Sequence, residues 1–107
     1  MGEELNFDEL INSEHLTVID FSATWCMPCR MLKPIIHRVA ENFDHVDFFE
    51  IDIDENEEIA KRYRIFSVPT LLCFKKGKKI DSLVGLNSAE TIEDFINKCD
   101  QVDVDKL

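Results

Sequence analysis

The chain has 107 residues, and 45% of them are hydrophobic, which is enough apolar material for one compact domain and too little for a second core. Its net charge is −10, and so acidic a protein is repelled by the phosphates of nucleic acids and by anionic lipid surfaces. Its longest apolar runs fall far short of the roughly 20 residues that span a bilayer. We therefore expect no nucleic-acid partner and no membrane association.

Hydrophobic periodicity predicts helices and strands that alternate along the chain. The predicted elements, in order, are a helix at 6–11, a strand at 16–21, a long helix that follows Pro28, a strand at 46–53, a short helix capped by Asn56, a hairpin of strands 70–74 and 80–84, and a helix capped by Asn87 or Ser88. The lysine-rich hairpin turn around Gly77 is expected to be solvated, and the tail from Asp100 to be solvated and frayed. Because a strand–helix–strand unit crosses over to a parallel partner, an α/β fold with helices on both sheet faces follows.

The strongest chemical signal is a pair of cysteines, Cys26 and Cys29, placed after a buried strand and at the start of the long helix. A thiol there faces unpaired N–H groups and the positive end of the helix dipole, so Cys26 is predicted to be a nucleophile of low pKa. Cys29 lies one turn later, close enough to form a disulfide, and Pro28 stiffens the loop between them. The pattern predicts a dithiol switch: an exposed Cys26 attacks a substrate disulfide, and a shielded Cys29 resolves the mixed disulfide.

Zinc binding is the alternative interpretation of this spacing. Structural zinc needs four ligands, yet Cys73 and Cys99 form no second closely spaced pair, and the three histidines form no ligand pair either. The dithiol interpretation is therefore favoured, with no metal. Cys73 lies in an apolar strand and Cys99 on the apolar face of a helix, so both are predicted to be buried, inert thiols.

A carboxylate within the apolar strand, Asp20, is the second candidate. Burying an ionised carboxylate costs several kcal/mol or raises its pKa. Asp20 therefore either reaches water at the end of the strand or carries a proton, and the residues alone leave both open. The dithiol helix begins six residues later, so a proton carrier here would serve Cys29 when it attacks.

Three segments closely resemble the thioredoxin family, and the likeness extends from about residue 6 to residue 99. These segments are Phe21-Ser22-Ala23-Thr24-Trp25-Cys26-Met27-Pro28-Cys29, Val68-Pro69-Thr70 and Phe74-Lys75-Lys76-Gly77. The resemblance implies a single thioredoxin domain with a central mixed sheet of four strands and helices on both faces. Residues 1–5 form a shortened N-terminus in which the family's first strand would be vestigial or absent, and residues 100–107 form an acidic tail.

The resemblance also implies roles for particular residues. Pro69 would be a cis-proline facing the dithiol, and Asp20 the buried acid–base residue beneath Cys29. The implied substrate-docking surface consists of Trp25, Met27, Pro28, Val68, Pro69, Val84, Gly85 and Leu86. Two positions depart from the family pattern: Met27 stands where Gly is usual, and Glu50 where bacterial members often have Lys, which leaves Asp20 without that cation.

The resemblance implies a thiol–disulfide oxidoreductase, and the residues favour a reductant. Oxidases and isomerases of this superfamily commonly carry a histidine between the cysteines, whereas Met27 and Pro28 carry no charge. The N-terminus has no leader pattern, so a cytoplasmic location is expected. With no nucleotide-binding G-x-G-x-x-G motif, a separate thioredoxin reductase would recharge the chain. Its redox group would be its own Cys26–Cys29 disulfide, with no other cofactor, and its substrates would be disulfide-containing client proteins.

We expect the protein to be a monomer. A second hypothesis assigns it a different class of function from the reductase. The apolar docking surface could hold a partner protein as a scaffold, with the redox chemistry incidental. Replacing Cys29 with Ser separates the two, because a scaffold keeps its partner whereas a reductase stalls as a mixed disulfide.

Overall fold

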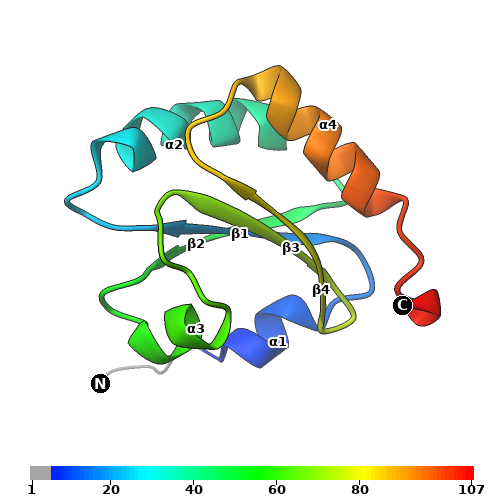
Figure 1. The fold of residues 1–107 in the computed structure, drawn as a ribbon. Coiled ribbons are helices and arrows are strands. Elements are labelled where there is room, and N and C mark those ends of the chain that lie inside the picture. The colour runs from blue at the N-terminus through cyan, green and yellow to red at the C-terminus, as the bar shows by residue number, and fades with distance from the viewer. Residues whose placement is uncertain (1–5) are drawn as a thin grey trace.

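The computed structural model describes residues 6–107, and its elements follow the predicted order. They are α1 (Phe7–Ile11), β1 (Thr17–Ser22), α2 (Met27–Ala40), β2 (Asp47–Asp52), α3 (Glu57–Arg62), β3 (Thr70–Lys75), β4 (Lys78–Val84), α4 (Ala89–Asp100) and a short 3-10 helix, η1 (Val104–Lys106) (Figure 1). The expectation of a vestigial first strand concerns residues 1–5, which lie outside the described residues. No described helix is both long enough and apolar enough to cross a membrane.

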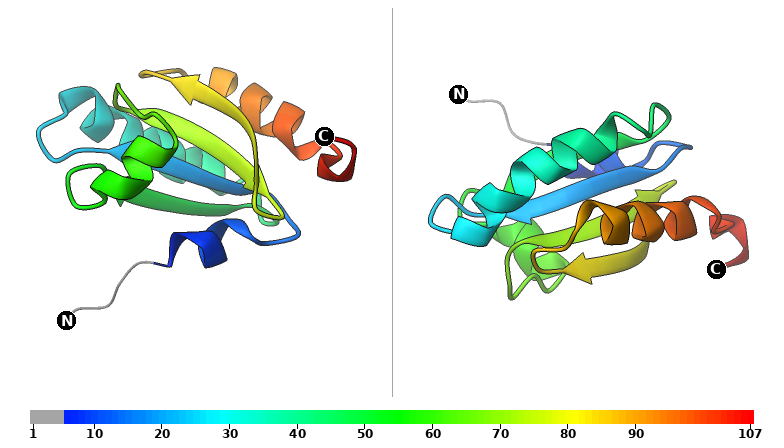
Figure 2. Two further views of the ribbon diagram at one scale, coloured as in Figure 1. Left: turned by 60° about the horizontal axis from the view of Figure 1, so that its bottom comes forward. Right: turned by 90° about the horizontal axis from the view of Figure 1, so that it is seen from above.

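The four strands form one mixed sheet in the order β2-β1-β3-β4, which confirms the predicted fold class. β1 pairs parallel with β2 and antiparallel with β3, and β3 pairs antiparallel with β4. Helices α2 and α4 cover one face of the sheet, while α1 and α3 cover the other (Figures 1 and 2). Every residue of the central strand β1 is buried, because both of its faces are covered.

Each face of the sheet has its own hydrophobic core. Alternate residues of β1 point to opposite faces, so Val18 joins the core beneath α2 and α4, and Ile19 joins the core beneath α1 and α3. In the second core, the ring of Phe7 on α1 packs edge-to-face on Phe74 of β3, with centroids 5.7 Å apart. The two cores fix β1 from both sides and thereby fix the loop that leads from β1 to the cysteines.

Residues close in sequence determine where the helices start and how the hairpin turns. The Oγ of Ser88 accepts a hydrogen bond from the N–H of Thr91 at 3.2 Å, so Ser88 rather than Asn87 caps α4. Asn56 occupies the predicted cap position of α3, but its side chain donates to the Asp52 carbonyl and makes no capping bond to the helix. In the β3–β4 turn, residues 76 and 77 both have positive φ, as a two-residue hairpin requires.

The acidic C-terminal segment 100–107 was expected to be solvated and frayed; most of its residues are exposed, but the segment is not frayed. The side chain of Val104 is 2% exposed, and Val104 lies within η1. Lys78 Nζ donates to the Val104 carbonyl, and Lys75 Nζ to the Asp100 carbonyl, both at 3.2 Å. Lys76 Nζ also lies 3.2 Å from the Asp105 carboxylate. The hairpin turn is exposed, as expected, and its lysines hold the C-terminal segment against the sheet together with the buried Val104.

Candidate redox site

The two cysteines of the motif form a disulfide at the start of α2. Cys26 is the residue that caps the helix, with extended backbone angles, and its Cα lies 5.3 Å from the Cα of Cys29. The backbone N–H of Cys29 donates to the Sγ of Cys26 at 3.2 Å. An N–H group at a helix N-terminus stabilises negative charge on the atom it faces, so the geometry favours a thiolate at Cys26 when the disulfide is reduced.

Cys26 is buried in the structure, whereas the sequence had indicated an exposed thiol. In this oxidised form Cys26 and Cys29 are 3% and 2% exposed. The Sγ of Cys26 lies 3.7 Å from the carbonyl oxygen of Val68, and Ala23 and Val68 belong to the small apolar cluster around the two sulfurs. The chain on either side of Cys26 is open, since the side chains of Trp25 and Met27 are 67% and 61% exposed.

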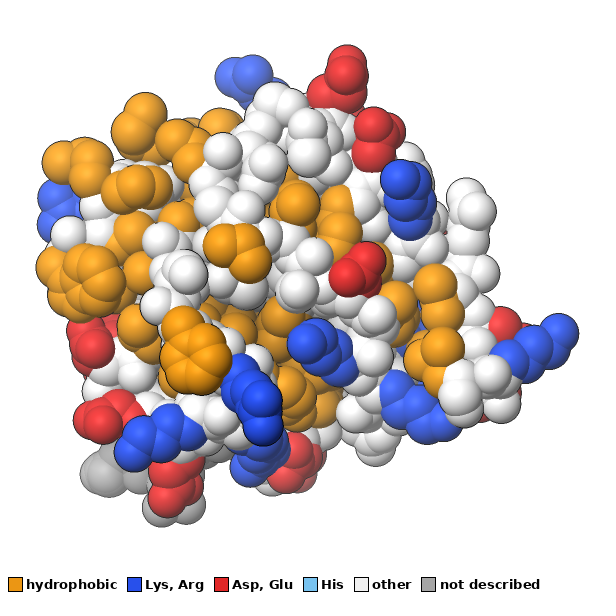
Figure 3. Space-filling view, in the orientation of Figure 1, with side chains coloured by type: hydrophobic (Ala, Val, Ile, Leu, Met, Phe, Trp, Pro, Cys, Tyr) orange, Lys and Arg blue, Asp and Glu red, His pale blue; other side chains and the backbone are white. Residues whose placement is uncertain are grey.

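The residues of the implied docking surface lie around the disulfide, but they differ in exposure. Trp25, Met27, Pro28, Val84 and Leu86 are exposed, Val68 and Gly85 are half-buried, and Pro69 is buried. The Val68–Pro69 peptide bond is cis, as the resemblance implied, and the N–H of Gly85 donates to the Pro69 carbonyl at 2.8 Å. Hydrophobic side chains gather over the end of the molecule at which α2 begins (Figure 3).

The sequence did not point to three further features of this part of the chain. The indole Nε1 of Trp25 donates to the Asp54 carboxylate at 2.8 Å, which orients the ring. Met31 is 54% exposed and lies one helical turn after Met27, a spacing that the sequence does show. Phe66 is 88% exposed and lies in the loop before the cis-proline, where no periodic pattern marks it.

Asp20 is a buried carboxylate, 6% exposed, on the face of β1 that packs against α2. Desolvation by burial, followed by the charge of Glu50, raises the pKa of Asp20 to about 7, against the opposing effect of Lys33. Glu50 is the register partner of Asp20 on the parallel strand β2. Oδ1 of Asp20 has no hydrogen-bond partner among the described residues. Asp20 is therefore poised to bind and release a proton near neutral pH.

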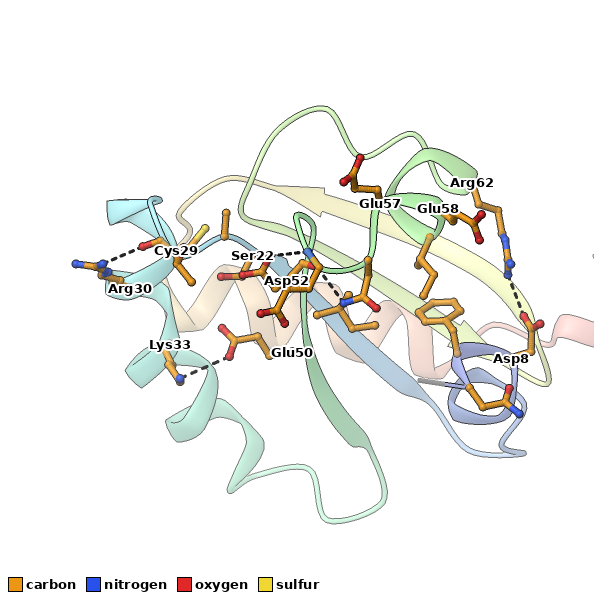
Figure 4. Close-up of a pocket in the computed structure, with 18 residues that line it drawn as sticks. Asp8, Ser22, Cys29, Arg30, Lys33, Glu50, Asp52, Glu57, Glu58 and Arg62 are labelled. Carbon is orange, nitrogen blue, oxygen red and sulfur yellow. Dashed lines mark hydrogen bonds and ion pairs between the residues drawn. The ribbon is translucent and has the colours of Figure 1, made fainter. Parts of the chain in front are cut away.

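Lys33 supplies the cation that the sequence had indicated Asp20 would lack. Its Nζ lies 3.5 Å from a carboxylate oxygen of Glu50, and its charge lowers the pKa of Asp20. Asp20, Lys33 and Glu50 line a cavity of about 90 Å³. Lys33 and Glu50 also line the larger, open hollow that Cys29 borders, where the ion pair lies near Cys29 (Figure 4). The Lys33–Glu50 pair thus connects the surroundings of the buried carboxyl with those of the Cys29 sulfur.

The remaining cysteines, Cys73 on β3 and Cys99 on α4, are free and buried, as predicted. A hydrogen bond with Cys99, followed by burial, raises the pKa of the Cys73 thiol above its ordinary value. A thiol that holds its proton is a poor nucleophile. Among residues 6–107, no group of three or more side chains is arranged to hold a metal ion.

Alkylation of the reduced protein should separate these environments. Iodoacetamide at neutral pH is expected to label Cys26 first, because its thiolate is stabilised at the helix start, and to leave Cys73 and Cys99 unlabelled until the protein is denatured. Peptide mapping by mass spectrometry gives the order of labelling. Early labelling of Cys73 would contradict both its burial and the assignment of the nucleophile.

Comparison with known proteins places this site in a family. The family model described as Thioredoxin matches residues 2–98. The chain is 45% identical over 93 residues to the thioredoxin of Chlamydia pneumoniae, covering 87% of this chain and 90% of that one. It is 42% identical over 87 residues to Thioredoxin H2 of Arabidopsis thaliana, covering 81% of this chain but only 65% of the length of that relative. The structure of a mutant thioredoxin from Halobacterium salinarum superposes with a TM-score of 0.83 at 32% identity, covering 94% of this chain and 88% of that one.

The sequence matches, the fold and the disulfide all indicate the same family. The matched segment contains the disulfide-forming pair Cys26 and Cys29 at the start of α2, with the cis peptide bond of Pro69 after the neighbouring Val68. Such a dithiol exchanges two electrons with other disulfides. The chain belongs to the thioredoxin family of thiol–disulfide oxidoreductases.

Proposed function

We propose that this protein disulfide reductase acts on cytoplasmic client proteins, with Cys26 as the attacking thiol, Cys29 as the resolving thiol and Asp20 as the proton carrier. The observation that carries these roles is the N–H of Cys29 directed at the Sγ of Cys26. It favours negative charge on the first sulfur and leaves the second sulfur on the side of the Lys33–Glu50 pair. The free, buried thiols of Cys73 and Cys99 suit a reducing compartment.

The first step forms a mixed disulfide. The Cys26 thiolate attacks one sulfur of the client disulfide, so that a new bond joins Cys26 to the client while the client's own S–S bond breaks. The second client sulfur leaves as a thiolate and takes a proton from water. The exposed side chains of Trp25 and Met27 are proposed to dock the client, because contact with apolar residues beside its disulfide removes their surface from water.

The second step releases the client. Cys29 gives its proton to the Asp20 carboxylate, directly or through one water, and the Cys29 thiolate attacks the Sγ of Cys26. The Cys26–Cys29 disulfide forms, the bond to the client breaks, and the client leaves with both of its sulfurs reduced. Two electrons have passed from the protein to the client. The proton on Asp20 is then returned to water.

A separate thioredoxin reductase is proposed to restore the dithiol. The family works with such reductases and with disulfide-containing substrates, and the disulfide itself is proposed to be the protein's only redox group. We propose a monomer as the working form, because copies that each carry a charge of −10 repel one another.

A turbidity assay tests the proposal. Reduction of a disulfide-linked protein such as insulin, with dithiothreitol as the source of electrons, should accelerate when this chain is added. The double variant Cys26→Ser/Cys29→Ser is the matched control and should show the background rate only. Equal rates for the wild type and this control would refute the reductase function.

Met27, the departure from the usual family residue, is expected to shape client choice. Its flexible thioether enlarges the apolar surface beside the disulfide and is 61% exposed. Met27→Gly should lower kcat/KM about fivefold for clients with apolar residues beside their disulfide, in line with the loss of one partly buried apolar side chain, and leave polar clients unchanged. Steady-state rates on a panel of protein clients check this. Unchanged relative rates across the panel would show that Met27 is a neutral substitution.

A further inference from the structure

Among residues 6–107, Phe66 is the most exposed of the large hydrophobic side chains, at 88%. It lies between two anchored residues of the loop that joins α3 to β3. On one side, Ile65 packs against the core beneath α1 and α3, and on the other, Val68 packs against the cluster of Ala23, Cys26 and Cys29. A large apolar side chain held in water between two packed neighbours has no structural role in the described part of the chain.

The loop presents Phe66 from a fixed backbone. The N–H of Ile65 donates to the Ala60 carbonyl at 2.9 Å, and the Thr70 hydroxyl donates to the Ser67 carbonyl at 2.7 Å. These bonds hold the chain on both sides of Phe66. A client that covers the ring therefore does not have to order the loop, and less conformational entropy opposes binding.

Phe66 lies within reach of a client held at the disulfide. The Val68 carbonyl is 3.7 Å from the Sγ of Cys26, and Phe66 comes two residues earlier, so its Cα lies within about 7 Å of that of Val68. An extended client segment covers a similar distance in two residues. The side chain two positions from the client's reacting cysteine can thus meet the ring of Phe66, which continues the proposed docking surface on the α3 side.

Two exposed cations lie close to Phe66 in the sequence. Lys61 and Arg64 are exposed and form no ion pair within residues 6–107, whereas Arg62 is paired with Asp8 at 3.0 Å. Lys and Arg side chains border the hydrophobic surface on the side of α3, interspersed with Asp and Glu side chains (Figure 3). In a protein of net charge −10, two unpaired cations within five residues of an exposed phenylalanine favour an acidic partner there.

We propose that Phe66, with Lys61 and Arg64, forms a specificity subsite for client segments that carry a large apolar residue two positions from the reacting cysteine, followed by acidic residues. The proposal rests on the proposed reductase function and names the class of client that the function prefers. Burial of the client's apolar side chain on Phe66 supplies affinity, and the two cations select the acidic flank.

Two synthetic disulfide-linked peptides and one small disulfide test the subsite. The first peptide has the sequence Glu-Leu-Ser-Cys-Ser-Leu-Glu, the second has Lys-Ser-Ser-Cys-Ser-Ser-Lys, and hydroxyethyl disulfide is too small to reach Phe66. Phe66→Ser is expected to lower kcat/KM about tenfold on the first peptide, the size expected for one apolar side chain left in water, and to leave the other two substrates unchanged. Leu107→Ala, an exposed apolar residue at the opposite end of the molecule, is the control.

The role of charge is tested separately with Arg64→Asn. Asn is chosen because it tolerates the positive φ of residue 64. It is expected to lower kcat/KM about threefold on the Glu-containing peptide at low salt and to have no effect at high salt, while Lys79→Gln changes nothing. An unchanged preference between the two peptides in Phe66→Ser would overturn the proposal, and so would an equal fall on all three substrates. A wild-type protein that fails on hydroxyethyl disulfide would instead refute the reductase function.

Discussion

Replacing Cys29 with Ser is expected to stop turnover and to leave client proteins covalently attached to Cys26. The first step needs only the Cys26 thiolate, so attack on the client still forms a mixed disulfide. A serine hydroxyl cannot attack the sulfur of Cys26 to form an S–S bond, so the client is not released. Steady-state reduction of protein disulfides should fall by at least about 1,000-fold, as expected when one member of a concerted catalytic pair is removed.

Non-reducing gels give the direct measurement. Cys29→Ser mixed with a client should give a band at the summed mass of the two proteins, and dithiothreitol should remove that band. Cys73→Ala, which removes a free and buried thiol, is the matched control and should turn over normally without an adduct. If Cys29→Ser held its partner in a complex that dithiothreitol does not release, the scaffold hypothesis would replace the reductase.

Local signals explain why so much of the fold could be predicted from the sequence. The apolar run at β1, the helical spacing of α2 and the glycine of the β3–β4 turn each act over a few residues, and each element forms where its pattern lies. The placement of Cys26 and Cys29 at the start of α2 is equally local, because it depends on the order strand, loop, helix. These features locate the dithiol without any knowledge of tertiary contacts.

The features that the sequence did not predict correctly come from contacts between distant segments. The burial of Cys26 depends on Val68, which lies 42 residues later in the chain. The packing of the C-terminal segment depends on the hairpin lysines, of which Lys75 donates to a carbonyl 25 residues away. The alternation of Asp and Val in this segment predicted a solvated tail, because it shows no continuous apolar face.

The role of Lys33 in the site also depends on contacts between distant segments, which the sequence did not predict. Its position four residues after Cys29 places it on the same side of α2, which the sequence indicates. Its charge acts on Asp20 together with that of Glu50, and Glu50 comes next to Asp20 only through the parallel register of β1 and β2. Because Glu50 replaces the lysine that bacterial relatives often have, the sequence indicated that Asp20 lacks a nearby cation. In the structure, Lys33 on α2 supplies that cation.

Asp20→Asn is expected to stabilise the protein above neutral pH. The pKa of Asp20 is about 7 in the folded state and 3.8 in the absence of the fold, so the folded state binds the proton more tightly. As the pH rises from 3.8 to about 7, the free energy of unfolding of the wild type therefore falls. The total loss, reached above pH 7, is on the order of 4 kcal/mol. The variant does not titrate, so its free energy of unfolding relative to the wild type should increase from pH 4 to pH 8. Urea unfolding at these two pH values measures the difference, and a constant difference would show that Asp20 has an ordinary pKa.

The same substitution should slow release of the client, because it removes the proton acceptor that we propose for Cys29. Only the ionised carboxylate accepts a proton, so the wild-type rate of the second step should rise with pH through about 7. Asp20→Asn should lack this rise and be slower by about 10- to 100-fold at pH 8, within the range for the loss of a general base. Trp25, the single tryptophan, lies beside Cys26 and reports the step by fluorescence in single-turnover experiments. A wild-type profile in Asp20→Asn would make Asp20 a structural residue only.

Two further variants decide whether the Lys33–Glu50 pair sets the pH of this step. Glu50→Gln removes a charge that raises the pKa of Asp20, so the rise in rate should move to lower pH. Lys33→Met removes the charge that lowers this pKa, so the rise should move to higher pH. Opposite shifts at an unchanged plateau rate are expected, because neither side chain takes the proton from Cys29. Shifts in the same direction, or a lower plateau in both variants, would show that the pair supports the fold of the site and does not tune Asp20.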